Sequence, residues 1–188
     1  MSSDQEIIRS VLSGDIEAFA GILHKYQDKV LRLCFAIVGP QDAEDAAQET
    51  FLKVYDSLSK FREESAFSTW LYRITSNHCL DILSKRKRRK EESLESLVER
   101  AGENVLAGSS ARHLSSSGNL AQSVMDRETV RGVLERMSPE ERAILVLREM
   151  EGLSYLEISQ TMEISMDLVK VRLFRARKLF QKIAQNLS

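Results

Sequence analysis

The sequence predicts an all-α protein with two small helical domains joined by a flexible linker. The 188-residue chain has only eight glycines and two prolines, well below the roughly 12% that these residues contribute to average proteins. So few turn-forming residues argue against a sandwich or barrel, which needs many hairpins. Apolar residues recur at spacings of three and four, the period of an amphipathic helix. Serine and aspartate precede several of these stretches, where helix N-caps are found.

Capping and helix-breaking residues delimit the first two predicted helices. We expect Asp4 to cap a short helix that ends near Gly14, and Asp15 to cap a longer helix that ends at Gly39. The longer helix has an apolar face formed by Phe19, Ile22, Leu23, Tyr26, Val30, Leu33 and Ile37. This face is expected to form the centre of the first core.

Two further helices complete the first predicted domain, residues 1–90. Asp42 is expected to open a helix whose inner face is formed by Ala43, Ala46, Ala47, Phe51, Val54 and Leu58. Ser65 or Ser68 is expected to start the next helix, whose inner face is formed by Leu71, Ile74, His78 and Ile82. That helix runs into the basic stretch 85–90, where cations interact favourably with the C-terminal end of the helix dipole.

Apolar periodicity weakens over residues 91–125, which we predict to be the linker. The stretch contains serine clusters at 109–110 and 115–117 and no large cluster of apolar residues, a composition typical of flexible linkers. Periodicity returns near Asp126, so the second helical domain is expected over residues 126–188.

The second domain has the clearest helix signals. Ser138 and Glu141 form a capping box with proline at the first helical position, and Ser154 and Glu157 form another. After a short connection, Ser165 can cap a long final helix. A short helix, a tight turn and a long helix make a helix-turn-helix.

The final helix has an apolar face and a basic face. The apolar face is formed by Val169, Leu173, Ala176, Phe180 and Ile183. The opposite face carries Val171, Phe174, Arg175, Lys178 and Lys182, flanked by Lys170, Arg172 and Arg177. A solvated face needs no apolar side chains, whereas a major-groove reader uses them against thymine methyls, with arginine on guanine and lysine on phosphate. The alternative is a plain three-helix packing unit.

A second candidate site for nucleic acid lies at residues 61–73, the densest aromatic segment in a chain with 6% aromatic residues. Rings alternate with arginines there, and Asn77 follows on the outer face of the helix. Aromatic rings beside cations bind unstacked nucleotides. The alternative is that Phe61, Phe67 and Trp70 belong to the core and that Asn77 is a surface amide.

Charge is unevenly distributed, although 27 basic and 28 acidic residues nearly cancel. Residues 85–90 are all basic, residues 170–188 contain six basic and no acidic residues, and acidic residues cluster near 42–49. One charged run is usually a solvated helix face, but two basic segments at the ends of two helical units favour nucleic-acid binding.

Membrane insertion, cofactors and catalysis are not expected. The longest apolar run, residues 33–38, is far shorter than the roughly 20 residues of a membrane span, and no secretory signal is visible at the start. Cys34 and Cys79 lack metal or redox spacing and are expected to be buried thiols of a cytoplasmic protein. There is no phosphate-binding glycine loop, HExxH motif or nucleophile elbow, so we expect no metal, no cofactor and no catalytic residue.

Five segments together carry a family resemblance. They are Asp42–Val54, Phe61–Glu63, Phe67–Ile74, Gly152–Ile158 and Arg172–Arg177. In this order and spacing they resemble the extracytoplasmic-function (ECF) sigma factors, the sigma-E-type branch of the bacterial sigma-70 superfamily. The resemblance implies a sigma-2-type N-terminal domain and a sigma-4-type C-terminal domain, and it leaves out mainly the linker.

The resemblance implies protein partners. In the family, the helix that matches 42–54 docks on the clamp helices of the largest subunit of core RNA polymerase. This implies a polymerase-binding role for Asp42, Glu44, Asp45, Gln48 and Glu49. The C-terminal domain is implied to contact the polymerase flap. An anti-sigma factor is implied to cover these faces until a stress signal arrives.

The resemblance also implies two promoter-reading surfaces. The minus-ten element is read as melted single strand, by residues matching Phe61, Arg62, Ser65, Phe67, Trp70, Arg73, Asn77, Lys85, Arg86, Arg88 and Arg89. The minus-thirty-five element is read as duplex, by residues matching Ser165, Met166, Asp167, Lys170, Val171, Arg172, Phe174, Arg175 and Lys178. Family members often have Gly-Thr-Val, a basic residue and serine where this chain has residues 167–171, so we expect it to read a different sequence from the best-known members.

We therefore predict a sigma factor that performs no reaction itself. One competing class is a regulator that binds duplex DNA without polymerase and uses its N-terminal domain to sense a ligand or to dimerise. Another is a nucleic-acid-processing enzyme, although the sequence offers no cluster of metal ligands. A gel shift on duplex DNA without polymerase tests the first alternative, and an activity assay with a divalent metal tests the second.

Overall fold

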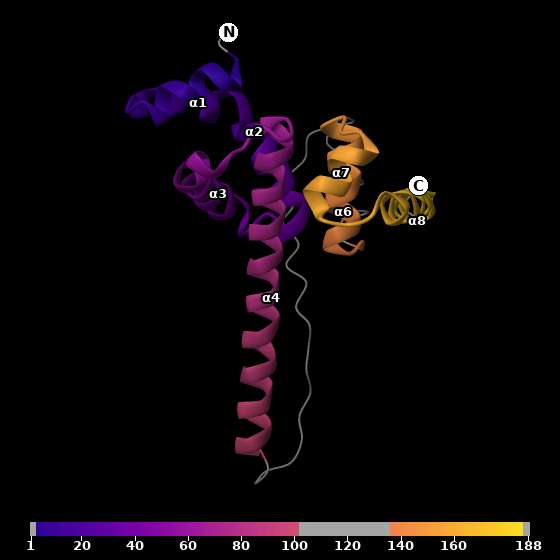
Figure 1. Cartoon of the computed structure of the whole chain (residues 1–188). Helices are drawn as coiled ribbons and strands as arrows, with labels where there is room; N and C mark the ends of the chain where they lie inside the picture. The colour runs from indigo at the N-terminus through magenta and orange to yellow at the C-terminus, as the bar shows by residue number, and fades with distance from the viewer. Residues whose placement is uncertain (1–2, 102–135, 186–188) are drawn as a thin grey trace, which may run out of the picture.

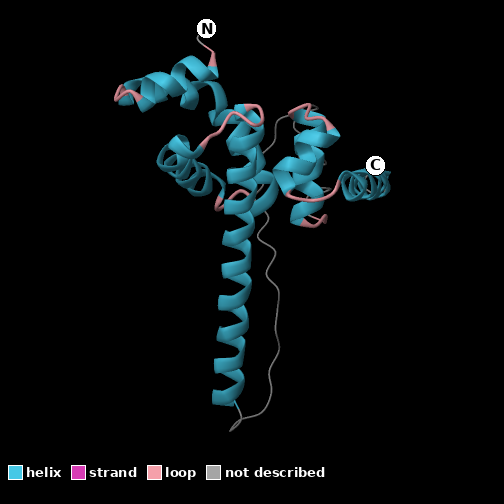
Figure 2. Cartoon of the chain, viewed as in Figure 1, coloured by secondary structure: helices cyan, strands magenta, loops and turns pink. Residues whose placement is uncertain are grey.

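The computed structural model describes residues 3–101 and 136–185, which form two helical domains packed side by side (Figure 1). Every regular element in these two ranges is helical (Figure 2), which confirms the predicted all-α fold class. The N-terminal domain contains α1 (Asp4–Leu12), α2 (Phe19–Val38), α3 (Ala43–Ser57) and α4 (Phe67–Ala101), with 3-10 turns at Ile16–Ala18 and Leu58–Lys60. The C-terminal domain contains α6 (Pro139–Leu145), a wide helical turn (Val146–Met150), α7 (Tyr155–Met162) and α8 (Met166–Gln185).

The first helix is capped one residue earlier than predicted. Ser3, not Asp4, is the N-cap: its hydroxyl accepts a hydrogen bond from the Glu6 amide at 3.3 Å, and its own amide donates to the Glu6 carboxylate at 2.8 Å. Ser3 takes this place because Glu6 stands three residues later, which completes a capping box. Asp15 does cap, accepting from the Ala18 amide at 3.3 Å, and the short turn that it opens leads directly into α2.

Helix α2 is the centre of the N-terminal core and packs against both α3 and α4. Its predicted inner face is buried except for Leu23, which is exposed on the outer side of the helix. The predicted inner face of α3 is buried throughout. On α4, Leu71 and His78 are buried, whereas Ile74 and Ile82 are only half-buried. Gly39 ends α2 at a φ of 88° and a ψ of 176°, a backbone conformation that is nearly confined to glycine.

Helix α4 continues beyond the basic stretch and projects from the body of the molecule (Figure 1). Residues 91–101 are helical, whereas weak apolar periodicity predicted an irregular linker there. At the start of this segment, Lys87 Nζ lies 3.8 Å from a carboxylate oxygen of Glu91, and Arg88 Nε lies 3.7 Å from one of Glu92. Such pairs, four residues apart, favour a helix slightly and leave no apolar signal in the sequence. The rest of the predicted linker and the predicted start of the second domain, residues 102–135, lie outside the described residues.

Both predicted capping boxes of the C-terminal domain are confirmed. Ser138 and Glu141 bond reciprocally at 3.3 and 2.9 Å, and Ser154 and Glu157 at 3.2 and 2.7 Å. The Ser165 hydroxyl accepts from the Leu168 amide at the start of α8, as predicted. The core between these helices contains Ile144, Leu147, Ile158, Val169, Leu173 and Ala176. The side chain of Ile183 lies outside the described residues.

The segment between α6 and α7 contains a wide turn that places Glu151. The Glu151 amide donates to the Val146 carbonyl, five residues back, at 3.0 Å, and the Leu153 amide donates to the Leu147 carbonyl at the same distance. Gly152 follows with a φ of 72°. This geometry ends the helix and directs the Glu151 side chain toward the N-terminal domain, where it contacts Arg32.

The two domains contact each other through α7 on α4 and α6 on α2. The Glu151 carboxylate accepts hydrogen bonds from Arg32 Nε at 3.1 Å, Arg32 Nη2 at 2.8 Å and the Tyr72 hydroxyl at 2.9 Å. Arg142 Nη2 also donates to the Ile37 carbonyl at 3.1 Å. The sequence predicted two domains joined by a flexible linker, and no local pattern in it indicated these contacts.

Candidate nucleic-acid interface

Three aromatic rings around the start of α4 form a contiguous cluster. The ring centroids are 5.5 Å apart for Phe61 and Phe67, 5.3 Å for Phe61 and Trp70, and 5.7 Å for Phe67 and Trp70. Tyr26 of α2 adds an edge contact to Phe67 at 5.7 Å. Phe67 is buried, Trp70 is 8% exposed and Phe61 is half-buried. The cluster is therefore part of the core on one side and a surface wall on the other.

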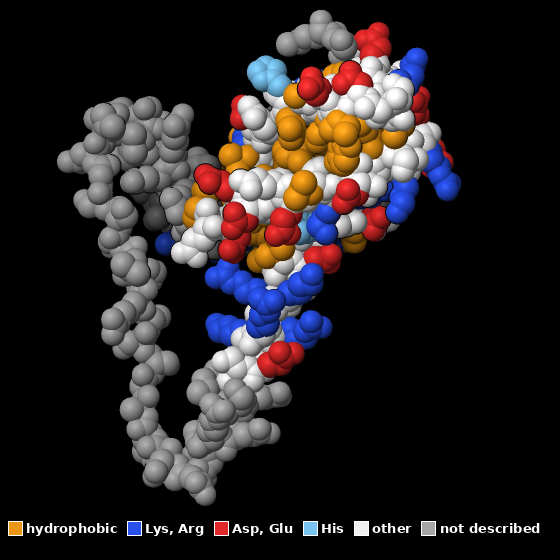
Figure 3. Space-filling view, turned by 90° about the vertical axis from the view of Figure 1, so that its left-hand side faces the viewer, with side chains coloured by type: hydrophobic (Ala, Val, Ile, Leu, Met, Phe, Trp, Pro, Cys, Tyr) orange, Lys and Arg blue, Asp and Glu red, His pale blue; other side chains and the backbone are white. Residues whose placement is uncertain are grey.

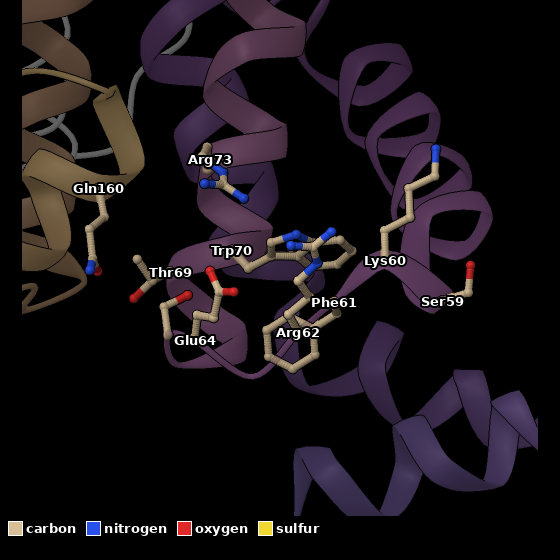
Figure 4. A pocket seen from close by; sticks show the side chains of 10 residues that line it. Ser59, Lys60, Phe61, Arg62, Glu64, Thr69, Trp70, Arg73 and Gln160 are labelled. Carbon is tan, nitrogen blue, oxygen red and sulfur yellow. The ribbon is translucent and has the colours of Figure 1, made fainter.

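A cavity of about 600 Å³ opens beside this cluster (Figure 4). It is lined by Ser59, Lys60, Phe61, Arg62, Glu64, Ser65, Thr69, Trp70, Arg73 and Gln160. Five of the predicted minus-ten residues line it together, and Lys60 adds a third basic side chain to the two arginines. Gln160 comes from α7 of the other domain and faces the cavity from the opposite side (Figure 4). Rings beside cations suit a base and its phosphate.

The other predicted minus-ten residues lie away from this cavity. Phe67 packs into the core, and Asn77 is exposed one turn further along α4 than Arg73. Lys85, Arg86, Arg88 and Arg89 lie on the projecting part of α4, where Figure 3 shows basic side chains gathered. At 1.5 Å per residue, Lys85 is about 18 Å along the helix from Arg73. These cations form a basic extension of the site rather than part of its wall.

The outer face of α8 is exposed, as its spacing predicts. Phe174 is 67% exposed, and Val171, Arg175 and Lys178 are exposed beside it. Ser165, Met166, Asp167 and Lys170 are exposed at the start of the helix, and Arg172 is half-buried. The Asp167 carboxylate lies 3.0 Å from Lys170 Nζ, so each partly neutralises the other.

Two arginines of α8 differ sharply in their surroundings. Arg177 donates to one oxygen of Glu149 from Nε at 2.9 Å and from Nη2 at 2.6 Å, which ties α8 to the wide turn. Arg175 makes no hydrogen bond or ion pair with the residues that the structure describes. Arg175 is therefore the arginine of this pair that is available to a base.

The predicted polymerase-binding residues of α3 are at least partly exposed, but two of them have partners within the chain. Asp42 accepts a hydrogen bond from Arg86 Nη1 at 2.9 Å, which joins a predicted polymerase residue to a predicted DNA residue. Glu49 lies 3.1 Å from His78 Nε2. Glu44, Asp45 and Gln48 are exposed.

An apolar groove next to these acidic residues was missed in the sequence analysis. It has a volume of about 860 Å³ and runs between α2 and α3. Its apolar lining includes the exposed side chains Leu23, Leu31, Leu52 and Tyr55, with Leu52 67% exposed. Figure 3 views the molecule from the side of α3 and shows hydrophobic side chains gathered on this face. The signal in the sequence was that Leu52 and Tyr55 fall outside the inner face of α3.

A second apolar groove lies on the C-terminal domain between α6 and α8. It has a volume of about 420 Å³, and Leu145, Val146, Met150 and Phe180 form its apolar lining. Glu149 and Arg177, which form an ion pair, also line it. Phe180, predicted to face the core, is half-buried: it packs against the core and also lines this groove.

The surroundings of His78 predict a pH-dependent stability for the N-terminal domain. Burial and the charge of Lys53 lower the pKa of His78 below 6.5, with a further contribution from Lys85, against the opposing effects of Glu49 and Asp81. The unfolded chain therefore binds more protons than the folded chain near and below this pH. We expect the free energy of unfolding to fall as the pH is lowered through 6.5.

Replacing His78 by glutamine is expected to make this pH dependence shallower. Urea unfolding at pH values above and below 6.5 measures it. His24 is exposed, so His24→Gln is the matched control and should leave the slope unchanged. Equal slopes in the wild type and in His78→Gln would contradict the prediction.

The two cysteines are buried free thiols, as predicted. A hydrogen bond with Cys34, together with burial, raises the pKa of the Cys79 thiol, so it stays protonated. Within the described ranges, no three His, Cys, Asp or Glu side chains are grouped to hold a metal ion. None of the described helices has both the length and the apolar character that crossing a membrane requires.

Both domains match known protein-family models. Residues 22–89 match Sigma-70 region 2, and residues 127–180 match Sigma-70, region 4. Over 185 residues the chain is 36% identical to the ECF RNA polymerase sigma-E factors of Salmonella typhimurium and Escherichia coli, and 34% identical to that of Haemophilus influenzae. These matches cover 98% of this chain and 96% or 97% of the relatives.

Solved structures of similar fold include two complexes. CnrH in complex with the cytosolic domain of CnrY aligns over all of both chains with a TM-score of 0.70 and 18% identity. The sigma factor RpoE in complex with the anti-sigma factor NepR, from Bartonella quintana, aligns over 89% of this chain and 96% of that chain. Its TM-score is 0.65, with 23% identity.

Proposed function

Because the chain belongs to the ECF sigma factors of the sigma-70 family, we propose that it binds core RNA polymerase and selects promoters through two separate DNA-reading surfaces. Sigma factors are transcription initiation factors and not enzymes. The observation that carries the two-surface proposal is the cavity of rings and cations on one domain, together with the exposed apolar and basic face of α8 on the other.

The cavity beside Trp70 is proposed to capture a base of the minus-ten element as it unstacks. Phe61 and Trp70 provide faces for stacking, and Lys60, Arg62 and Arg73 provide positive charge for the phosphates. Unstacking a base costs a few kcal/mol, and stacking on an aromatic side chain contributes about 1–3 kcal/mol. Capture therefore offsets much of the cost of melting at the sequence that fits the cavity.

The α8 helix is proposed to read the minus-thirty-five element in the major groove. Val171 and Phe174 supply apolar contacts of the kind that thymine methyls accept, and Arg175 supplies the fork of donors that guanine accepts. The Asp167 carboxylate pairs with Lys170, which partly neutralises a negative charge that would otherwise repel DNA phosphates. This combination supports a target different from that of family members with serine at the position of Val171.

The two apolar grooves are proposed as polymerase-docking surfaces. The α2–α3 groove has exposed leucines bordered by Glu44 and Gln48, a mixture of apolar centre and polar rim that is typical of protein interfaces. It extends the predicted clamp-binding surface beyond the acidic residues. The α6–α8 groove is the corresponding candidate for the polymerase flap.

An anti-sigma factor is proposed as the inhibitor. The structure of RpoE with NepR is a complex of a sigma factor with an anti-sigma factor. A similar fold in this chain is consistent with a similar partner, and a sigma factor acts in the cytoplasm, where polymerase and promoter DNA are found. Affinity purification from unstressed cells should recover an inhibitory protein, and recovery of polymerase alone would contradict this part of the proposal.

Run-off transcription with purified core polymerase on a genomic promoter library tests the proposed function. We expect transcripts that start at defined sites only when the chain is added. Failure to confer any start-site selection would overturn the proposal. A gel shift on duplex DNA without polymerase should show at most weak binding, and tight sequence-specific binding there would favour an independent regulator.

A further inference from the structure

The loop that joins the 3-10 turn Leu58–Lys60 to α4 forms one wall of the cavity beside Trp70. We call residues 61–66 the capture loop. Four of its residues line the cavity, namely Phe61, Arg62, Glu64 and Ser65 (Figure 4). Glu63 does not line it, although both of its neighbours in the chain do. The chain therefore turns at Glu63 so that this one side chain leaves the wall.

Glu63 adopts a strained backbone conformation. Its φ is 57°, in the left-handed region that residues with a β-carbon rarely occupy. Within the described ranges, the other non-glycine residue with a positive φ is Glu163, which ends α7 and donates its amide to the Ser159 carbonyl. Glu63 ends no helix, and its backbone makes no hydrogen bond with the residues that the structure describes. Such a conformation persists only where surrounding groups hold it.

A hydrogen bond from α1 holds the Glu63 side chain. Gln5 Nε2 donates to Glu63 Oε2 at 3.0 Å, across 58 positions of the sequence. Helix α1 packs against the 3-10 turn that precedes the capture loop. It is also anchored on α2, because Asp4 accepts hydrogen bonds from Lys25 at 2.6 Å and from Tyr26 at 2.7 Å. The donor is therefore carried by a helix that is itself fixed to the domain.

We propose that the hydrogen bond between Gln5 and Glu63 is a positioning contact, which keeps the capture loop in the left-handed turn that places Arg62 and Glu64 on the cavity wall. A loop that is already in shape does not have to be ordered when a base enters, so capture loses less conformational entropy. Neither Gln5 nor Glu63 was among the predicted minus-ten residues. The role of the contact in capture rests on the proposed function, whereas its effect on the loop does not.

Single-strand binding by the holoenzyme tests the role in capture. The probe is an oligonucleotide that carries the minus-ten strand of a promoter found by run-off transcription, so its affinity reports capture without the melting step. Glu63→Ala removes the acceptor, whereas Glu63→Gln removes the charge but keeps an oxygen that accepts. We expect Glu63→Ala to bind the probe about 2-fold to 10-fold more weakly than Glu63→Gln, the range for one hydrogen bond. Gln5→Ala should lose a similar factor relative to the wild type.

Tryptophan fluorescence tests the effect on the loop in the free chain, without polymerase or DNA. Trp70 is the single tryptophan and is 8% exposed. Its ring centroid lies 5.3 Å from that of Phe61 in the capture loop, so loosening of the loop exposes it. Acrylamide quenching should therefore rise in Gln5→Ala and in Glu63→Ala, and it should stay at the wild-type level in Glu63→Gln.

The chain offers a matched control for these variants. Glu163 is exposed, has a φ of 52°, and makes no side-chain hydrogen bond with the residues that the structure describes. Glu163→Ala should change neither the quenching nor the affinity for the probe. The double variant Gln5→Ala, Glu63→Ala should lose no more than Glu63→Ala alone, because both substitutions remove the same contact. Circular dichroism confirms that each variant retains its helices.

The outcomes separate the two proposals. Equal quenching in Glu63→Ala and Glu63→Gln would overturn the positioning contact, and so would additive losses in the double variant. Increased quenching with unchanged affinity for the probe would overturn its role in capture. Quenching as expected, combined with no start-site selection by the wild type in run-off transcription, would support the contact and overturn the proposed function.

Discussion

Replacing Trp70 by alanine is expected to prevent promoter melting while polymerase binding persists. Trp70 is one wall of the cavity and contacts the rings of Phe61 and Phe67. Its loss removes a stacking surface worth about 1–3 kcal/mol per base, which is comparable with the cost of unstacking. Permanganate footprinting of thymines near the minus-ten element measures melting directly. Normal footprints with the variant would contradict the assigned role.

Two control variants separate this effect from loss of stability. Truncating a buried tryptophan costs about 3–5 kcal/mol of folding free energy, so folding must be measured in parallel. Leu71→Ala removes a fully buried neighbour that does not line the cavity, and it should lower stability but leave melting intact at temperatures where it is folded. Trp70→Phe retains a ring and should retain partial melting. Equal melting defects in Leu71→Ala and Trp70→Ala would indicate a structural role only.

Replacing Arg175 by alanine is expected to weaken minus-thirty-five recognition by about 5-fold to 150-fold, since a bidentate arginine–base contact contributes about 1–3 kcal/mol. Arg175 is exposed on the same face as Val171 and Phe174. Its removal disturbs no hydrogen bond among the residues described for α8. Promoter binding by the holoenzyme, measured on templates with single base changes in that element, checks the prediction. Polymerase binding should be unchanged, and an equal loss of both would refute the assignment.

Arg175→Lys distinguishes base reading from phosphate binding. Lysine keeps the charge but lacks the planar fork of donors. If Arg175 reads a base, Arg175→Lys should lose discrimination among the mutated templates but keep the salt dependence of binding. If Arg175 only contacts phosphate, the lysine variant should behave like the wild type in both respects.

Local signals in the sequence predicted the helices well, because capping depends on residues that are close together in the chain. The boxes at Ser138 and Ser154 and the cap at Ser165 form as predicted. The predicted cap of α1 was wrong for an equally local reason, because Glu6 completes a capping box with Ser3 and not with Asp4. The helical conformation of residues 91–101 was missed because apolar periodicity is weak there, and ion pairs such as those of Glu91 and Glu92 leave no apolar signal in the sequence.

The candidate site was predicted in part. Five of the residues predicted between positions 61 and 73 line the cavity, but sequence spacing could not show that Phe67 faces the core while Trp70 lines the opening. The α2–α3 groove needs two helices placed together before Leu31 and Leu52 become neighbours on one surface. The hydrogen bond between Arg32 and Glu151 joins residues separated by 119 positions, a relation that no local pattern encodes.

The wide turn at Val146–Met150 has a consequence for how this family can vary. Its hydrogen bond reaches five residues back, to Val146, so it contains one residue more than an α-helical turn would hold. Deleting one residue there would restore ordinary helical pitch and rotate Glu151 by about 100° around the axis. Arg32 and Tyr72 would then face a different side chain, although no residue in either domain had been substituted. Relatives that differ in length at this point should therefore differ in how strongly their two domains contact each other. Insertions or deletions, more than substitutions, would be the route by which the strength of this contact evolves.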